Sequence, residues 1–143
     1  MRKAITIFAV IIIGLAFSAC SAQKEKRGTV FDEIQNSSVA LMESSDGDKV
    51  YVWNMLDLGS LASLRIEETS LEPADKEDDW MYRITYNPKD KVKNGEEIIV
   101  SFHREYIQIG TKLYSTKQGV EFADILEWAE SKFEYLVNEY GAE

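Results

Sequence analysis

The chain has few residues whose type and spacing could do chemistry. It has one cysteine, Cys20, and one histidine, His103. A zinc site needs three or four ligands, and a catalytic triad needs a nucleophile and a carboxylate placed around a histidine. Neither set can be assembled around His103 from the sequence. We therefore interpret His103 as a surface or edge residue of a strand, and expect no metal and no cofactor.

Acidic residues are numerous, but their spacing predicts no site. Residues 72–79 (EPADKEDD) gather several carboxylates, which are the kind of ligand that calcium prefers. The EF-hand loop needs ligands at alternate positions, a central glycine and a closing glutamate, and this run lacks that order. With 25 Asp and Glu residues in the chain, some pair lies close by chance. A solvated acidic loop and a non-enzymatic protein are the expectation.

The apolar run before Cys20 sets the expected chemistry of that thiol. Arg2 and Lys3 precede residues 4–19, which carry no charge. Sixteen helical residues reach about 24 Å, short of the ~30 Å hydrocarbon core. A positive start, a short apolar run and small residues at its end are typical of a cleaved export signal.

Phe17-Ser18-Ala19-Cys20 resembles the lipobox of bacterial lipoproteins, although that family usually has Leu where this chain has Phe17. The resemblance implies that Cys20 is acylated (for example with palmitate) and becomes the first residue after cleavage. Two or more acyl chains hold a protein stably at a membrane. Three alternatives are cleavage after Ala22 to release the protein, an uncleaved anchor, and an unmodified or disulfide-bonded thiol.

The lipobox resemblance implies a signal peptide at 1–19 and a lipidated cysteine with a flexible tether at 20–28. We expect residues 29–143 to form a single domain. Without residues 1–19, the chain has 14 basic and 25 acidic residues and a formal net charge of −11. Such a charge disfavours nucleic acid, whose phosphates need a basic surface. The same negative charge disfavours adsorption to anionic lipid, so we expect the acyl chains, and not surface charge, to attach the protein to the membrane.

The distribution of apolar and turn residues in 29–143 predicts an α+β fold with an antiparallel sheet of four to five strands. Runs at 39–42 and 50–53 flank an Asp46-Gly47 turn and predict a hairpin. Alternation at 80–86 and 98–103, followed by 106–109 and a resumption at 113–114, predicts a meander. A short helix over 54–66 is expected, with a strand over 64–71 as the competing interpretation.

The C-terminal helix is the clearest predicted element. Apolar residues recur at three- and four-residue spacing from Phe122 to Tyr140, and Gly141 follows them. This stripe needs a partner surface, and the sheet is the available one. We therefore expect the helix–sheet contact to form the centre of the core.

Aromatic residues provide the remaining candidate site. Trp80 and Tyr82 open a predicted strand, while Trp128 and Tyr135 lie one heptad apart beside the helix stripe. Exposed Trp and Tyr side chains recognise sugars or proteins, whereas large aromatics in small domains mostly serve the core. Both interpretations of Trp80, Tyr82, Trp128 and Tyr135 stay open here.

Taken together, the chain resembles small bacterial envelope lipoproteins of unknown function. The resemblance implies a lipid-anchored protein on the extracytoplasmic face of a cell membrane, with no functional residue beyond Cys20. We expect a non-catalytic binding module with an envelope protein as partner. The alternative is a receptor or hydrolase for a glycan or peptide, which needs a concave pocket with converging polar groups.

Overall fold

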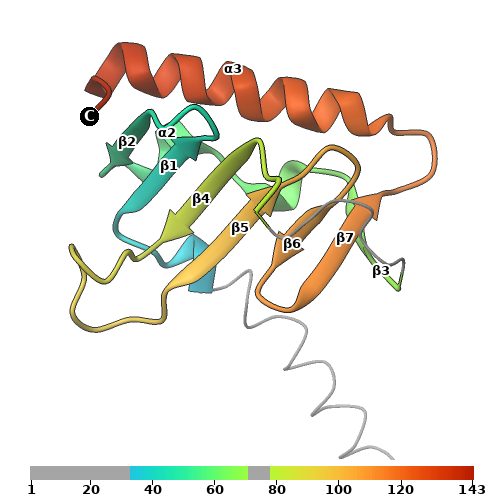
Figure 1. Ribbon diagram of the computed structural model, residues 1–143. Coiled ribbons are helices and arrows are strands. Elements are labelled where there is room, and N and C mark those ends of the chain that lie inside the picture. Colours follow the sequence, from blue (N-terminus) through green and yellow to red (C-terminus); the bar gives the residue numbers. More distant parts are fainter. Residues whose placement is uncertain (1–32, 71–77) are drawn as a thin grey trace, which may run out of the picture. The chain divides into compact units, whose positions relative to one another are not determined.

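The computed structural model describes residues 33–70 and 78–143, and residues from Ile34 to Glu143 form one compact unit (Figure 1). The predicted signal peptide, Cys20, the tether and most of the acidic run lie outside the described residues. Residues 33–35, at the start of the described part, are helical. The elements that follow are β1 (Ala40–Ser44), β2 (Lys49–Val52), α2 (Met55–Leu58), η1 (Leu61–Ser63), β3 (Ile66–Thr69), β4 (Tyr82–Tyr86), β5 (Ile98–Phe102), β6 (Ile107–Ile109), β7 (Lys112–Thr116) and α3 (Phe122–Tyr140).

The strands form one antiparallel sheet in the order β2-β1-β4-β5-β6-β7-β3. The α+β class and the helix-covered antiparallel sheet are confirmed. The predicted count of four to five strands is wrong, because the described part of the sheet has seven. The extra strands are β3, which pairs with β7 at the far edge, and β7 itself, which is a full strand and not a short resumption.

The predicted helix over 54–66 is mostly wrong. Asn54 caps α2 by accepting a hydrogen bond from the Leu56 N–H. The helix then ends at Leu58, because Gly59 has φ of 80° and ψ of −178°, a conformation that is almost confined to glycine. A 3-10 turn and β3 follow, so the competing strand interpretation was closer for residues 66–69.

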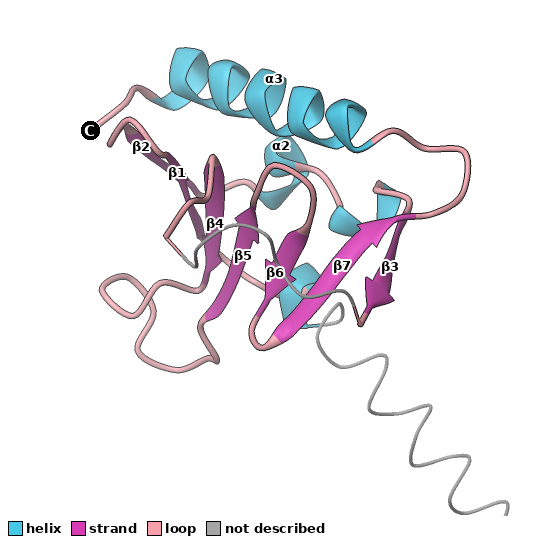
Figure 2. Cartoon of the chain, turned by 45° about the vertical axis from the view of Figure 1, so that its right-hand side comes forward, coloured by secondary structure: helices cyan, strands magenta, loops and turns pink. Residues whose placement is uncertain are grey.

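One face of the sheet is buried beneath the helices. On this face, residues paired in register on neighbouring strands form apolar rows across the sheet. The central row consists of Val50, Met42, Ile84, Val100 and Ile109. Helix α3 lies over this face (Figures 1 and 2) and buries a stripe formed by Ile125, Ala129, Phe133 and Leu136. The predicted helix–sheet core is therefore present.

The opposite face of the sheet, which we call the open face in contrast to the covered face beneath α3, carries a mixed set of side chains. One register row across it reads Lys49, Glu43, Arg83, Ser101 and Gln108. Ile99 on this face is 40% exposed, whereas Thr85 and Ser101 are buried. The sheet is therefore two-sided, with one apolar and one largely polar surface.

Both borders of the sheet are short strands. β2 and β3 each have four residues. The Glu143 N–H donates a 2.8 Å hydrogen bond to the carbonyl of Lys49, so the C-terminal residue occupies part of the β2 border. At the β3 border, Glu67 and Glu68 are exposed.

Candidate functional site: an apolar pocket beside Tyr86

The four aromatic side chains predicted as a patch lie in different surroundings. Tyr82 meets Phe133 of α3 with ring centroids 5.7 Å apart, and Trp128 meets Phe102 of β5 at 6.1 Å. Phe102 is also the cross-strand partner of Tyr82. These contacts make Tyr82 and Trp128 part of the packing between α3 and the sheet.

Trp80 and Tyr135 lie apart from that packing. Trp80 is half-buried, and the Arg83 guanidinium lies 4.3 Å from the centre of its ring. Arg83 also donates a 3.3 Å hydrogen bond from Nε to the Ser101 hydroxyl on the polar face. Tyr135 is 44% exposed on α3, with the Lys132 ammonium 5.6 Å from its ring centre. Each ring is therefore next to a cation.

His103 was placed wrongly by the sequence interpretation. It has no exposed surface, and its ring stacks on that of Tyr106 with centroids 4.2 Å apart and planes 11° apart. The tight turn between β5 and β6 explains this position, because the His103 N–H bonds the Tyr106 carbonyl at 2.9 Å and folds both rings inward. His103 is a residue of the core.

The part of the chain that the structure describes has neither a membrane-spanning helix nor a metal cluster. In residues 33–70 and 78–143, no helix has the length and apolar character needed to cross a bilayer. No cluster of three or more His, Cys, Asp or Glu side chains suited to a metal ion occurs in these same residues. Most of the acidic run considered for calcium lies outside the described residues.

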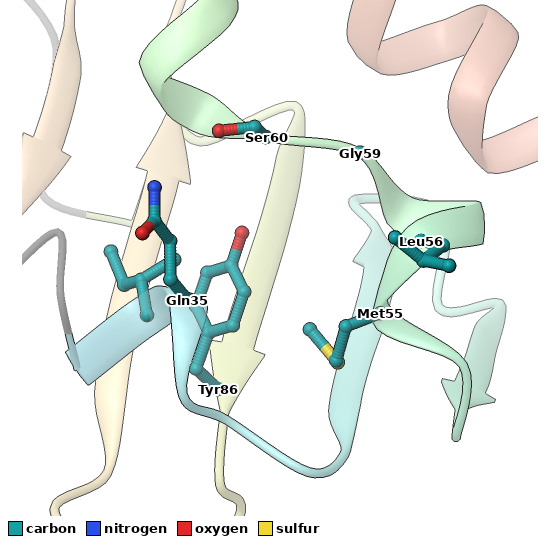
Figure 3. Close-up of a pocket in the computed structure, with 7 residues that line it drawn as sticks. Gln35, Met55, Leu56, Gly59, Ser60 and Tyr86 are labelled. Carbon is teal, nitrogen blue, oxygen red and sulfur yellow. The ribbon is translucent and has the colours of Figure 1, made fainter.

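A largely apolar pocket contains a buried polar group, the hydroxyl of Tyr86. It lies on the helix-covered face, between residues 34–35, strand β4 and helix α2. We call it the Tyr86 pocket, and it is lined by Ile34, Gln35, Met55, Leu56, Gly59, Ser60 and Tyr86 (Figure 3). Its volume is about 220 Å³, and none of the described lining residues is charged. The lining suits an uncharged molecule or side chain.

Helix α2 is held in place at this pocket by α3. The Lys132 ammonium donates a 3.0 Å hydrogen bond to the Asp57 carbonyl, and the Tyr140 hydroxyl donates to the Asp57 carboxylate. Trp128 lies against the position of Gly59, where a Cβ atom would come within 3.9 Å of its ring. These contacts fix one wall of the pocket although α2 has only four residues.

The hydroxyl of Tyr86 is the unusual feature of the pocket. Tyr86 is 1% exposed, and its hydroxyl has no hydrogen-bond partner among the described residues. Figure 3 shows this end of the ring pointing between Gln35 and Ser60, with Met55 across the space. Burial raises the pKa of the Tyr86 hydroxyl, so the group stays protonated and can donate a hydrogen bond.

This site was missed by sequence reasoning. Tyr86 was predicted only as part of the alternating run at 80–86, and residues 55–56 only as part of the helix expected over 54–66. The available signal was weak: a tyrosine at an inward position of a central strand needs a partner for its hydroxyl. Nothing in the sequence placed residues 34–35 and 55–60 next to it.

Comparison of the chain with protein-family models, with curated proteins and with solved structures found no match.

Proposed function

We propose that this protein is a lipid-anchored binding module on the extracytoplasmic face of a bacterial cell membrane, without catalytic activity of its own. The proposed location is supported by Cys20, which directly follows a 16-residue uncharged run that ends in the small residues Ser18 and Ala19. The acyl chains on Cys20 hold the domain, since its acidic surface has little attraction for anionic lipid.

The binding role is supported by the content of the Tyr86 pocket. Hydrolysis needs a nucleophile next to a base, or paired carboxylates that flank the substrate. The described lining has a phenol, an amide and a serine hydroxyl among apolar groups. Such a lining can enclose and orient a molecule, and it has no base to activate a nucleophile.

A protein partner in the envelope is the second part of this proposal. Trp53 and Leu56 are 60% and 87% exposed and lie three residues apart at the start of α2. Exposed Trp side chains frequently anchor protein interfaces. Crosslinking of intact cells followed by capture of the protein should recover a specific envelope partner, and a Trp53→Ala, Leu56→Ser variant should recover much less of it. Equal recovery by this variant would remove these two residues from the interface.

Anchoring is tested with Cys20→Ser and metabolic labelling by a palmitate analogue. The unaltered protein should incorporate the label and sediment with membranes, and its mature form should begin at a modified residue 20 by mass spectrometry. The Cys20→Ser variant should incorporate no label. An unmodified Cys20 thiol in the native protein would end the lipoprotein proposal and leave the fold as described.

A further inference from the structure

We propose that the Tyr86 pocket binds a small uncharged molecule with a compact apolar body and one oxygen acceptor, and that the Tyr86 hydroxyl donates a hydrogen bond to that oxygen. This inference deepens the proposed function, because it gives the binding module a ligand class. It does not depend on the modification of Cys20.

The size of the pocket limits the ligand. A closed apolar cavity of about 150 Å³ holds one benzene ring. The Tyr86 pocket, at about 220 Å³, has room for one ring or a branched aliphatic group with a short substituent. A polysaccharide or a folded peptide segment would have to remain mostly outside.

The charge of the ligand follows from the lining. Moving a carboxylate or an ammonium group out of water is costly unless a partner charge meets it. No described lining residue carries a charge, and the domain as a whole is strongly acidic. The pocket therefore favours a neutral molecule over an anion, and offers no carboxylate for a cation.

The Tyr86 hydroxyl determines the polar feature of the ligand. A buried hydroxyl without a partner costs free energy, and that cost is recovered when an acceptor arrives. A ketone, ester or ether oxygen can accept this hydrogen bond. Gln35 and Ser60, which are exposed at the rim, can contact a second polar atom of the ligand (Figure 3).

The test uses the full-length chain in lipid nanodiscs with ¹³C-labelled methionine methyl groups. Met55 lines the pocket and reports occupancy, while the buried Met42 in the central core row serves as an internal control. Acetophenone supplies a ring and an acceptor, cumene has the same size without an acceptor, and benzoate has a charged carboxylate. Affinities are calculated from free aqueous concentrations, which removes the effect of partition into lipid.

We expect acetophenone to shift the Met55 methyl resonance saturably and to leave Met42 unchanged. Tyr86→Phe should weaken acetophenone about two- to tenfold, the range expected for one neutral hydrogen bond, and leave cumene within about twofold. Benzoate should bind at least about tenfold more weakly than acetophenone. The matched control Tyr135→Phe, an exposed tyrosine outside the pocket, should change neither affinity.

A second variant keeps the test informative if Tyr86→Phe disturbs the sheet. Leu56 is 87% exposed at the mouth, so Leu56→Asp should leave the fold intact and weaken both acetophenone and cumene. Absence of any saturable Met55 shift would overturn the pocket as a binding site. Equal effects of Tyr86→Phe on both probes would overturn the role of the hydroxyl. Tight benzoate binding would overturn the ligand class, and none of these results bears on Cys20.

Discussion

The two faces of the sheet are built from the same strands but are stabilised differently. On the covered face, Met42, Ile84 and Val100 are register neighbours without exposed surface. On the open face, the neighbouring positions are Glu43, Arg83 and Ser101, and the contacts there are polar. The comparison shows that period-2 alternation fixes which face is buried, while the covering helices decide how well it is buried.

The helices pack on the covered face more closely at one end of the strands than at the other. At the Tyr82 and Phe102 end, α3 packs with aromatic rings. At the Tyr86 end, the short helix α2 and residues 34–35 border the Tyr86 pocket. Helix α2 has only four residues, and the Tyr86 pocket lies beside it.

The largest expected difference between the faces comes from a matched pair of isoleucines. Ile84→Ala removes a side chain with 0% exposure from the central core row and should lower the free energy of unfolding by about 2–5 kcal/mol. Ile99→Ala, on the open face of the adjacent strand, should cost less than about 1.5 kcal/mol because its side chain is 40% exposed. Urea denaturation measures both. Similar losses would mean that the open face is covered in solution.

Substitution of Gly59, which ends helix α2 on the covered face, should lower the stability of the fold. Its backbone conformation is almost restricted to glycine, so Gly59→Ala should lower stability by about 1–3 kcal/mol. The added Cβ would lie 3.7 Å from the Lys132 ammonium, an ordinary contact, so backbone strain is the expected cause. Gly110→Ala is the control, since it has φ of 60° and no atom within 4 Å of the added Cβ. A larger loss at Gly110 would contradict this explanation.

The hydroxyl of Tyr86 should lower stability when the pocket is empty. Tyr86→Phe removes a buried donor that has no described partner, and should raise the free energy of unfolding by about 1 kcal/mol. Thermal and urea unfolding in the absence of ligand measure this change. A loss of stability would show that the hydroxyl is satisfied in solution and would weaken the inference about a ligand.

The smallest effect is expected on the open face, at Tyr51 of β2. Its hydroxyl donates a 2.7 Å hydrogen bond to the Asp90 carboxylate, and this contact is the main reason that its pKa is raised to about 12. Asp90→Asn should return the titration midpoint of the Tyr51 ring resonances toward the ordinary value of about 10. An unchanged midpoint in this variant would contradict the assignment to Asp90.

The sign of the pH effect follows from this shift. Because the pKa of Tyr51 is higher in the folded chain than in the unfolded one, the folded chain retains the proton to higher pH. The Tyr51–Asp90 contact therefore stabilises the fold below about pH 10, and its contribution disappears as the pH rises from about 10 to about 12. Tyr51→Phe should remove this part of the pH dependence, as measured by urea unfolding between these values.

Much of the fold was predictable from local patterns. The Asp46-Gly47 turn and its flanking runs correctly predicted the β1–β2 hairpin, and alternation around Ile84 and Val100 predicted β4 and β5. Three- and four-residue spacing predicted α3, because a single stripe must face the sheet. These elements depend on neighbours within a few residues, which a sequence shows directly.

The parts that could not be predicted depend on contacts between distant segments. β3 pairs with β7, whose register partners lie 44 to 50 residues later, and its short run shows no strong alternation. His103 is buried because a turn stacks it on Tyr106, and no period describes that geometry. The Tyr86 pocket combines Ile34, α2 and β4, so only the folded chain brings its walls together.

The short border strands have a consequence for crowded conditions. An extended segment of another chain that added to β2 could pair with only a few peptide groups, since Glu143 already occupies the carbonyl of Lys49. At β3, such a segment would run beside the exposed carboxylates of Glu67 and Glu68. Growth of the sheet from molecule to molecule would therefore gain few hydrogen bonds, which is how natural sheets resist fibre formation. This protection would matter most for a protein concentrated on a two-dimensional surface.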